Sequence, residues 1–198
     1  MIKLQLFRHG ETDWNKLRLT QGQSDIPLNM TGVAQAFELS RVLEDEKFDL
    51  ILSSDLARAN QTAKYALIKH DPNIPMILSE NLRETNFGDA EGKPKDYLIE
   101  HYSNILEQWD NPHHEDTFDV AIKDGETPRQ VINRFLHCIE DSINQYPNSR
   151  SVAVFTHLNL MCCINKYVSK EFKLFKNGES LTLYYSPETG KISKSNTK

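Results

Sequence analysis

An arginine, a histidine and a glycine follow directly on a short apolar run near the start of the chain. The run spans residues 4–7 and leads into Arg8, His9 and Gly10. A parallel α/β sheet keeps its ligands at the carboxyl ends of its strands. An arginine beside a histidine at such a point could hold an oxyanion against a nitrogen nucleophile. On their own, these three residues slightly favour a structural interpretation, in which His9 is a core histidine and Gly10 a plain turn.

Three other polar residues stand at comparable points of the chain. Arg58 lies in the first turn of a predicted helix, Glu84 follows a predicted strand, and His157 comes just after an apolar run. Because the carboxyl ends of parallel strands meet at one edge of a sheet, we expect these side chains to lie close to Arg8 and His9.

The elements that must position these groups alternate between strands and helices. Apolar patterning predicts strands at 2–6, 50–52, 76–78 and 152–155, and a closing hairpin of 181–185 with 191–194. Helices are expected from an N-cap at Thr31 to Leu43, from the capping residues 53–55 to Leu67, near 96–109, and from a capping box of Thr127 and Gln130 to Tyr146.

This alternation predicts one α/β domain over residues 1–198. We expect a three-layer sandwich with a mainly parallel central sheet flanked by helices. Residues 82–124 are less regular and are expected to form a segment that covers the substrate.

The composition is that of an ordinary soluble domain. The 198 residues are 38% hydrophobic and 26% charged, and a chain of this length buries roughly 70% of its unfolded surface without a metal or disulfide. A net charge of −5 makes it a poor general binder of nucleic acid. With no signal peptide and no stretch of membrane-span length, we expect a cytoplasmic protein with reduced thiols.

Five motifs follow one another between residues 8 and 157. They are Arg8-His9-Gly10-Glu11-Thr12 with Trp14-Asn15, the run from Ser53 to Ala63, Arg83-Glu84 with Phe87-Gly88 and Glu91-Gly92, Gly125-Glu126-Thr127, and Thr156-His157. In this order they resemble the histidine phosphatase superfamily, which contains the phosphoglycerate mutases. The short middle segment is more similar to the phosphatase branch, which includes broad-specificity phosphatases and alpha-ribazole phosphatase.

The resemblance implies a phosphohistidine intermediate on His9. Arg8 and Arg58 would clamp the phosphate oxygens with forked, permanently charged donors, and His157 would add another donor. His9 would attack phosphorus as a neutral imidazole. Glu84 would protonate the leaving alkoxide and then accept a proton from water, so this carboxyl must start protonated. Because guanidinium groups supply the charge stabilisation, no metal or other cofactor is expected.

Three further residues are expected to contact the substrate. The resemblance implies that Asn15 and Gln23 line the pocket, with a solvated loop as the alternative for Gln23. Leu158 stands where the superfamily usually has glycine after the second histidine. Its backbone amide is kept, but its side chain would either narrow the pocket or alter the leaving-group side, and leucine lacks glycine's access to positive φ.

Each of these residues also has a purely structural interpretation. The two histidines fit core or capping positions, the two arginines fit surface ion pairs, and Glu84 could be a bystander beside Arg83. The run 113–116 resembles a metal cluster, but adjacent histidines in one loop cannot easily share a tetrahedral ion. A mobile loop over the pocket is favoured there. Cys162 and Cys163 fit small core residues of a helix.

Three functions fit these observations. The leading one is a histidine acid-type phosphatase, a metal-independent hydrolase of a small phosphorylated metabolite. The second is a phosphoglycerate mutase, which needs a stable phosphoenzyme primed by a bisphosphate. The third is a non-catalytic phospholigand-binding protein, which only Leu158 supports. The expected partner is a small phosphorylated substrate, with no nucleic acid and no membrane, and a homodimer is an open option.

Overall fold

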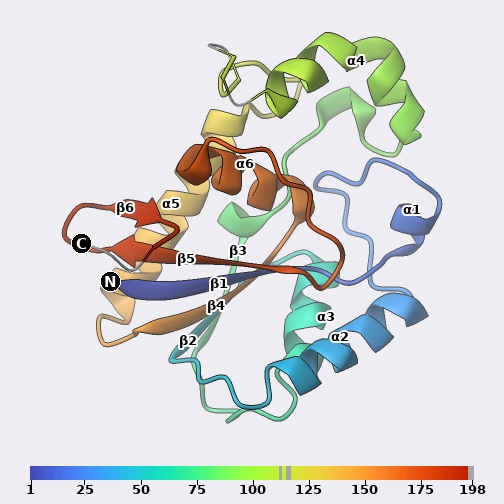
Figure 1. Cartoon of the computed structure of the whole chain (residues 1–198). Coiled ribbons are helices and arrows are strands. Elements are labelled where there is room, and N and C mark those ends of the chain that lie inside the picture. Colours follow the sequence, from blue (N-terminus) through green and yellow to red (C-terminus); the bar gives the residue numbers. More distant parts are fainter. Residues whose placement is uncertain (112, 115–116, 196–198) are drawn as a thin grey trace.

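A sheet of six strands forms the centre of the protein (Figure 1). The computed structural model describes residues 1–111, 113–114 and 117–195. The strands are β1 (Ile2–Arg8), β2 (Leu50–Ser54), β3 (Met76–Ser79), β4 (Ser151–Thr156), β5 (Ser180–Ser186) and β6 (Lys191–Ser193). They lie in the order β3-β2-β4-β1-β5-β6.

The sheet is mainly parallel, as the sequence predicted. Strands β3, β2, β4 and β1 run parallel to their neighbours, whereas β5 is antiparallel to β1 and pairs with β6 in the expected hairpin. In the register of β1 with β4, Arg8 lies opposite Thr156. The residues that follow each of these two, His9 and His157, therefore leave the same edge of the sheet side by side.

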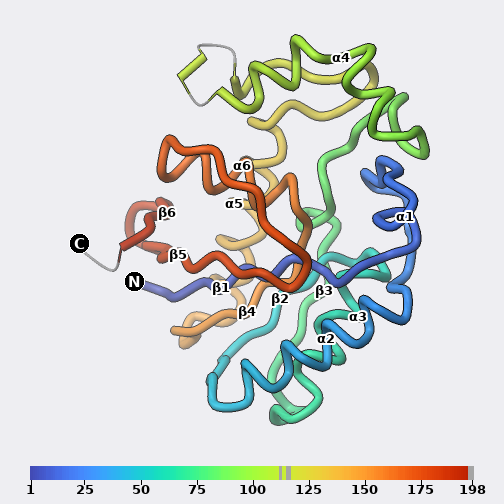
Figure 2. The backbone as a smooth tube through the Cα atoms, turned by 45° about the vertical axis from the view of Figure 1, so that its right-hand side comes forward, coloured from blue at the N-terminus to red at the C-terminus, as the bar shows by residue number. Residues whose placement is uncertain are grey.

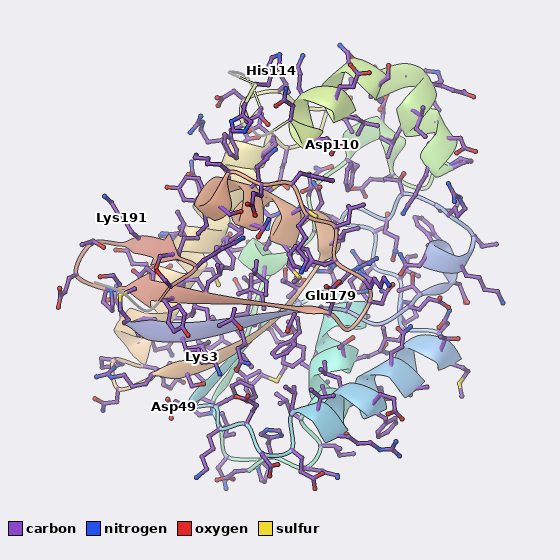
Figure 3. All side chains as sticks on the ribbon, in the orientation of Figure 1. Lys3, Asp49, Asp110, His114, Glu179 and Lys191 are labelled. Atoms are coloured by element: carbon purple, nitrogen blue, oxygen red, sulfur yellow. The ribbon has the colours of Figure 1, made fainter. Side chains whose placement is uncertain are left out.

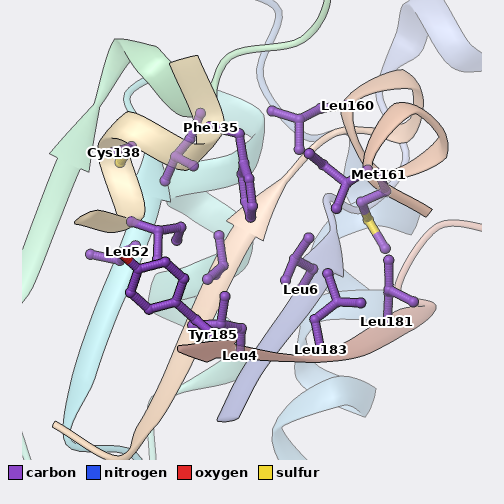
Figure 4. Packing of buried hydrophobic residues seen from close by; sticks show 14 of the residues in the cluster. Leu4, Leu6, Leu52, Phe135, Cys138, Leu160, Met161, Leu181, Leu183 and Tyr185 are labelled. Carbon is purple, nitrogen blue, oxygen red and sulfur yellow. The ribbon is translucent and has the colours of Figure 1, made fainter. Parts of the chain in front are cut away.

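Helices cover both faces of this sheet, which gives the predicted three layers (Figure 1). One face carries α2 (Met30–Val42) and α3 (Ala57–Ala66), and the other carries α5 (Pro128–Gln145) and α6 (Leu158–Ser169). Figure 4 shows the larger core, between the sheet and the second pair. Its labelled side chains include Leu4, Leu6 and Leu52 from strands, Phe135 and Cys138 from α5, and Leu160 and Met161 from α6.

The helix starts show which local signals decide a boundary. Thr127 and Gln130 form the predicted capping box. The predicted cap at Thr31 is wrong, because α2 begins two residues earlier and the side chain of Asn29 accepts from the Gly32 amide. At α3 no neighbouring side chain caps the helix, and the Ala57 amide donates instead to Asp25, which lies far away in sequence.

The short helix η1 (Glu80–Leu82) follows β3 and packs against the sheet through Leu82, which belongs to the main core. Beyond it, η2 (Gly88–Ala90) and the longer α4 (Lys95–Asp110) form a cap, and α4 lies apart from the sheet (Figure 2). The cap's own small core is built around Leu98, Trp109 and Ile122. That residues 82–124 cover the substrate stays a prediction. Among the described residues, no helix has the length and apolar character needed to span a membrane.

Candidate active site

A cavity of about 280 Å³ opens where the carboxyl edge of the sheet meets the cap. Arg8, His9, Arg58 and Glu84 all line it. His157 is completely buried and is not among the described residues that line the cavity. The rings of His9 and His157 nevertheless lie 5.2 Å apart between centroids. The structure therefore brings the five predicted residues together in one cluster.

His9 is oriented by the residue that follows it. Its Nδ1 lies 2.6 Å from the carbonyl oxygen of Gly10. A carbonyl only accepts hydrogen bonds, so Nδ1 carries the hydrogen and Nε2 keeps its lone pair. Gly10 itself is required by packing, because a Cβ there would lie 2.5 Å from the carbonyl oxygen of Gly32. His9 is thus held in a fixed turn, and the lone pair of its Nε2 is not used by the Gly10 contact.

Arg58 fixes the second histidine in the opposite tautomer. Its Nε donates to His157 Nδ1 at 3.2 Å, so the hydrogen of that imidazole is on Nε2. The other two guanidinium nitrogens donate to the carbonyls of Gly22 and Ser24, each at 2.7 Å. Arg58 is fully buried, and two of its five N–H groups remain without these partners.

Two buried donors of the cluster lack a hydrogen-bond partner within the described part of the chain. One is His157 Nε2 and the other is Arg8 Nε. Arg8 Nη1 donates to the carbonyl of Phe175 at 2.7 Å, which holds the guanidinium in place. Buried polar groups are seldom left unpaired in folded proteins. An anion with several oxygen atoms would accept a hydrogen bond from each of these two unpaired donors.

Burial sets the protonation state of the cluster. Burial first, and then the charge of Arg58, hold the pKa of His9 and His157 well below 6.5. Burial also lowers the pKa of Arg58 to about 10 and that of Arg8 in the same direction. At neutral pH both imidazoles are therefore uncharged and both guanidinium groups keep their charge.

Glu84 occupies the N-terminal end of α6. Its carboxyl oxygens accept from the backbone amides of Asn159 and Leu160 at 3.1 Å and of Thr85 at 2.9 Å. A helix N-terminus stabilises negative charge, so these three donors suit a carboxylate in the ligand-free protein. That Glu84 starts the reaction protonated stays a prediction, because it concerns the state with an anion bound.

The ion pair of Arg134 with Glu126 holds the backbone of Glu84 and was not assigned a role from the sequence. Arg134 donates to the carbonyls of Glu84 and Asn81 at 2.9 and 2.8 Å and pairs with Glu126 at 2.9 Å. Glu126 in turn accepts from the Asn86 amide. The motif Gly125-Glu126-Thr127 was the available signal, but only the fold shows that it faces the Glu84 loop.

The three predicted substrate contacts have different surroundings. Asn15 and Leu158 line the cavity. Leu158 lies in the first turn of α6 with helical backbone, so its position does not require glycine's positive φ. Gln23 points elsewhere: its amide donates to the Glu84 carbonyl at 3.2 Å, and it is not among the described residues lining the cavity.

The other side of the cavity, toward the cap, is apolar, which the sequence did not indicate. Trp109 and Leu98 from α4 line it together with Cys162 from α6 and Phe172 from the following loop. Cys162 was predicted to be a core residue, and burial raises its pKa to about 12, so its thiol stays protonated. No metal-binding cluster occurs among the described residues, and the run 113–116 lies partly outside them.

Residues 4–193 match the family described as the histidine phosphatase superfamily, branch 1. The chain belongs to this superfamily. It is 32% identical to the phosphatase PhoE of Bacillus subtilis over 154 residues, 78% of this chain and 71% of that protein. It is 34% identical to the probable phosphoglycerate mutase GpmB of Yersinia pestis over 164 residues, 83% of this chain and 73% of that protein.

Solved structures show the same fold. The alpha-ribazole phosphatase of Shigella flexneri is 26% identical, with a TM-score of 0.72 over 93% of this chain and 91% of that chain. A mycobacterial glucosyl-3-phosphoglycerate phosphatase, 24% identical, has a TM-score of 0.83 over 98% and 96%. The second likeness concerns the fold alone.

Proposed function

We propose that this protein is a metal-independent phosphomonoester hydrolase that acts through a phosphohistidine on His9. One observation supports this most strongly. A neutral imidazole with a free Nε2 lies beside two guanidinium groups and two unpartnered buried donors. That arrangement places a nucleophile beside hydrogen-bond donors that can bind a phosphate dianion. A small phosphorylated metabolite is the proposed substrate.

The first step transfers the phosphoryl group to the enzyme. Arg8, Arg58 and the Nε2–H of His157 bind the nonbridging oxygens, which orients phosphorus toward His9. The His9 Nε2–P bond forms while the ester P–O bond breaks, and Glu84 gives its proton to the leaving oxygen. The arriving dianion favours the protonated form of the Glu84 carboxyl, because two negative groups repel each other.

The second step returns the enzyme to its starting state. Glu84, now a carboxylate, takes a proton from a water molecule that attacks phosphorus. The Nε2–P bond breaks, inorganic phosphate forms, and Glu84 is again protonated. The guanidinium groups hold the charge of the transferred group in both steps. All proton transfers therefore go through one carboxyl.

Trapping the covalent intermediate tests the proposal. The protein is mixed with ³²P-labelled aryl phosphate in EDTA, quenched within milliseconds and digested. We expect an acid-labile, alkali-stable label on the peptide that contains His9, and turnover that EDTA does not change. His9→Ala should lose the label and at least about 10⁴-fold of turnover. His70→Ala, a histidine outside the cluster, is the matched control. Undiminished turnover in His9→Ala contradicts the assignment.

Phosphoglycerate mutase activity is the second candidate, since the GpmB relative carries that name. A mutase returns the phosphoryl group to an alcohol before water reaches it. Interconversion of 2- and 3-phosphoglycerate, with a bisphosphate supplied, should then be faster than release of inorganic phosphate. We expect the opposite order.

A further inference from the structure

The cavity has two chemically different ends. One end carries the charged cluster around His9, and the other is formed by leucine and aromatic side chains, most of them from the cap and from the loop after α6. The residues of this apolar end are Leu19, Phe87, Leu98, Leu106, Trp109, Leu158, Phe172 and Leu174. In the proposed reaction the alcohol part of the ester must extend away from the phosphate, and these side chains are what it meets.

The far wall of this apolar end is held rigidly. Trp109 is 6% exposed, and its Nε1 donates to the carbonyl of Val120 at 3.0 Å. Its own carbonyl accepts at 2.5 Å from Nζ of Lys166, a side chain of α6 that is only 3% exposed. Lys166 also donates to Thr117 Oγ1 at 3.0 Å and forms no ion pair among the described residues. A buried lysine used in this way positions the indole.

The apolar lining continues to the mouth of the cavity. Phe172 is 39% exposed and Leu174 is 64% exposed, and both border the cavity. The two charged cap residues that border it, Lys95 and Asp110, are exposed as well (Figure 3 labels Asp110 at the end of α4). They can stay in water while a ligand covers the apolar side chains.

Several polar side chains that line the cavity already have partners. The amide nitrogen of Asn159 donates to Thr85 Oγ1 at 2.8 Å, and the amide oxygen of Asn15 accepts from the Thr12 backbone at 3.1 Å. The Cys162 thiol donates to the carbonyl of Lys173. Thr20 Oγ1 is buried without a partner among the described residues, so it can pair with one ligand hydroxyl. A leaving group with several hydroxyls would lose water against the apolar side chains and pair only some of its hydroxyls, which is costly.

We propose that the substrate is the phosphate monoester of a compact apolar alcohol that carries a ring, rather than of a sugar or polyol. The inference rests on the proposed phosphatase function and adds the substrate class. The alcohol's ring packs between Trp109 and Phe172 while the phosphate binds at His9. Burying one ring of this size favours the apolar ester by about 10- to 100-fold in kcat/KM.

The test compares benzyl phosphate with glycerol 3-phosphate. Both are esters of primary alcohols of similar acidity, so the chemical step is matched and the alcohol's polarity differs. We expect kcat/KM to favour benzyl phosphate by about 10-fold or more. Equal values, or a preference for glycerol 3-phosphate, overturn the inference and leave the phosphatase proposal standing. If neither ester is hydrolysed, both proposals fail.

Phe172→Ala gives the sharper comparison, with Phe37→Ala as its control. Both phenylalanines have nearly equal exposure, 39% and 41%, but Phe37 lies on α2 and packs on Tyr65, outside the cavity. We expect Phe172→Ala to lower kcat/KM for benzyl phosphate about 3- to 10-fold more than kcat/KM for glycerol 3-phosphate. Equal effects of the two variants contradict a ring site.

Lys166→Met tests the positioning of Trp109. The variant keeps the apolar stem and removes the ammonium, so the Trp109 carbonyl loses its donor. We expect a raised KM for benzyl phosphate alone, with kcat unchanged and the thermal midpoint measured alongside. A folded variant with both KM values unchanged shows that Lys166 does not position the wall.

Discussion

The two ends of the cavity are built in different ways. The charged end comes from residues at or just after strand ends, so the backbone of the sheet fixes Arg8, His9 and His157. The apolar end comes largely from α4 and the loop after α6, and it is placed by the small core of the cap together with the hydrogen bonds of Trp109. Under the proposed function, the sheet would hold the reacting groups and the cap would recognise the alcohol.

Replacing the proton donor should have the largest effect on the charged end. Glu84→Gln keeps the size of the side chain but cannot give up a proton. We expect kcat for an alkyl phosphate to fall by about 10²- to 10⁴-fold, because its alkoxide needs that proton. A nitrophenyl ester should lose much less, since its leaving group needs no proton. Steady-state kinetics with a series of esters of rising alcohol pKa provide the measurement.

A matched variant separates proton transfer from charge. Glu126→Gln changes a carboxyl that pairs with Arg134 and does not line the cavity. Its effect should be similar for alkyl and aryl esters. If Glu84→Gln also slows both classes equally, the carboxyl is not the general acid.

The second histidine should contribute next. His157→Gln removes the ring whose Nε2 is buried and unpartnered, and we expect a loss of about 10²- to 10³-fold in kcat. The loss in kcat should be the same for benzyl phosphate and glycerol 3-phosphate, because His157 is proposed to contact the phosphate and not the alcohol. A loss confined to one ester would break the proposed division between the two ends.

The two buried imidazoles of the charged end should also make the free energy of unfolding decrease at acidic pH. The pKa of both buried imidazoles lies well below 6.5 in the folded protein, so the unfolded chain binds more protons once the pH falls below about 6.5. The free energy of unfolding should then decrease by up to about 1.4 kcal/mol per pH unit for each imidazole.

Urea unfolding at pH 7 and pH 5.5 measures this dependence. His157→Gln lacks one of the two imidazoles, so its decrease across the interval should be smaller than that of the wild type. Carboxylate titrations contribute to both proteins alike and cancel in the difference. Identical decreases would show that His157 does not titrate abnormally.

The cap should give the smallest effects. Leu106→Ala shortens a half-buried side chain of α4 that lines the cavity. We expect KM for benzyl phosphate to rise about 3- to 10-fold with kcat kept, because only uniform binding is lost. A large fall in kcat for every ester would instead mean that the cap helps to position the reacting groups.

The sheet and the clustering of Arg8, His9 and His157 could be predicted from the sequence. Strand ends and motifs coincide at Arg8, His9 and His157, so local patterns and the topology of parallel strands suffice to bring these side chains together. The helix caps show the limit. Asn29 competes with Thr31 two residues away, and Asp25 caps α3 only because the fold brings the two segments together.

The surroundings of the reacting residues could not be predicted in the same way. The amides that hold Glu84 come from α6, and Arg134 reaches its carbonyl from α5. The apolar wall depends on how α4 packs, and leucine or tryptophan at helical spacing looks the same in a core and in a cavity. For Gln23 a pocket position and a solvated loop were both open, and neither indicated its hydrogen bond to the Glu84 carbonyl.

Helix α6 contacts both ends of the cavity, one near its first turn and the other near its last. Its first amides receive Glu84, and Lys166, two turns further along, holds Trp109 of the cap. A library that varies α4 and the loop 170–175 while keeping this one lysine would therefore change what the enzyme accepts without redesigning how it reacts. Substrate range and catalytic machinery can in this way diversify at different speeds within one small domain.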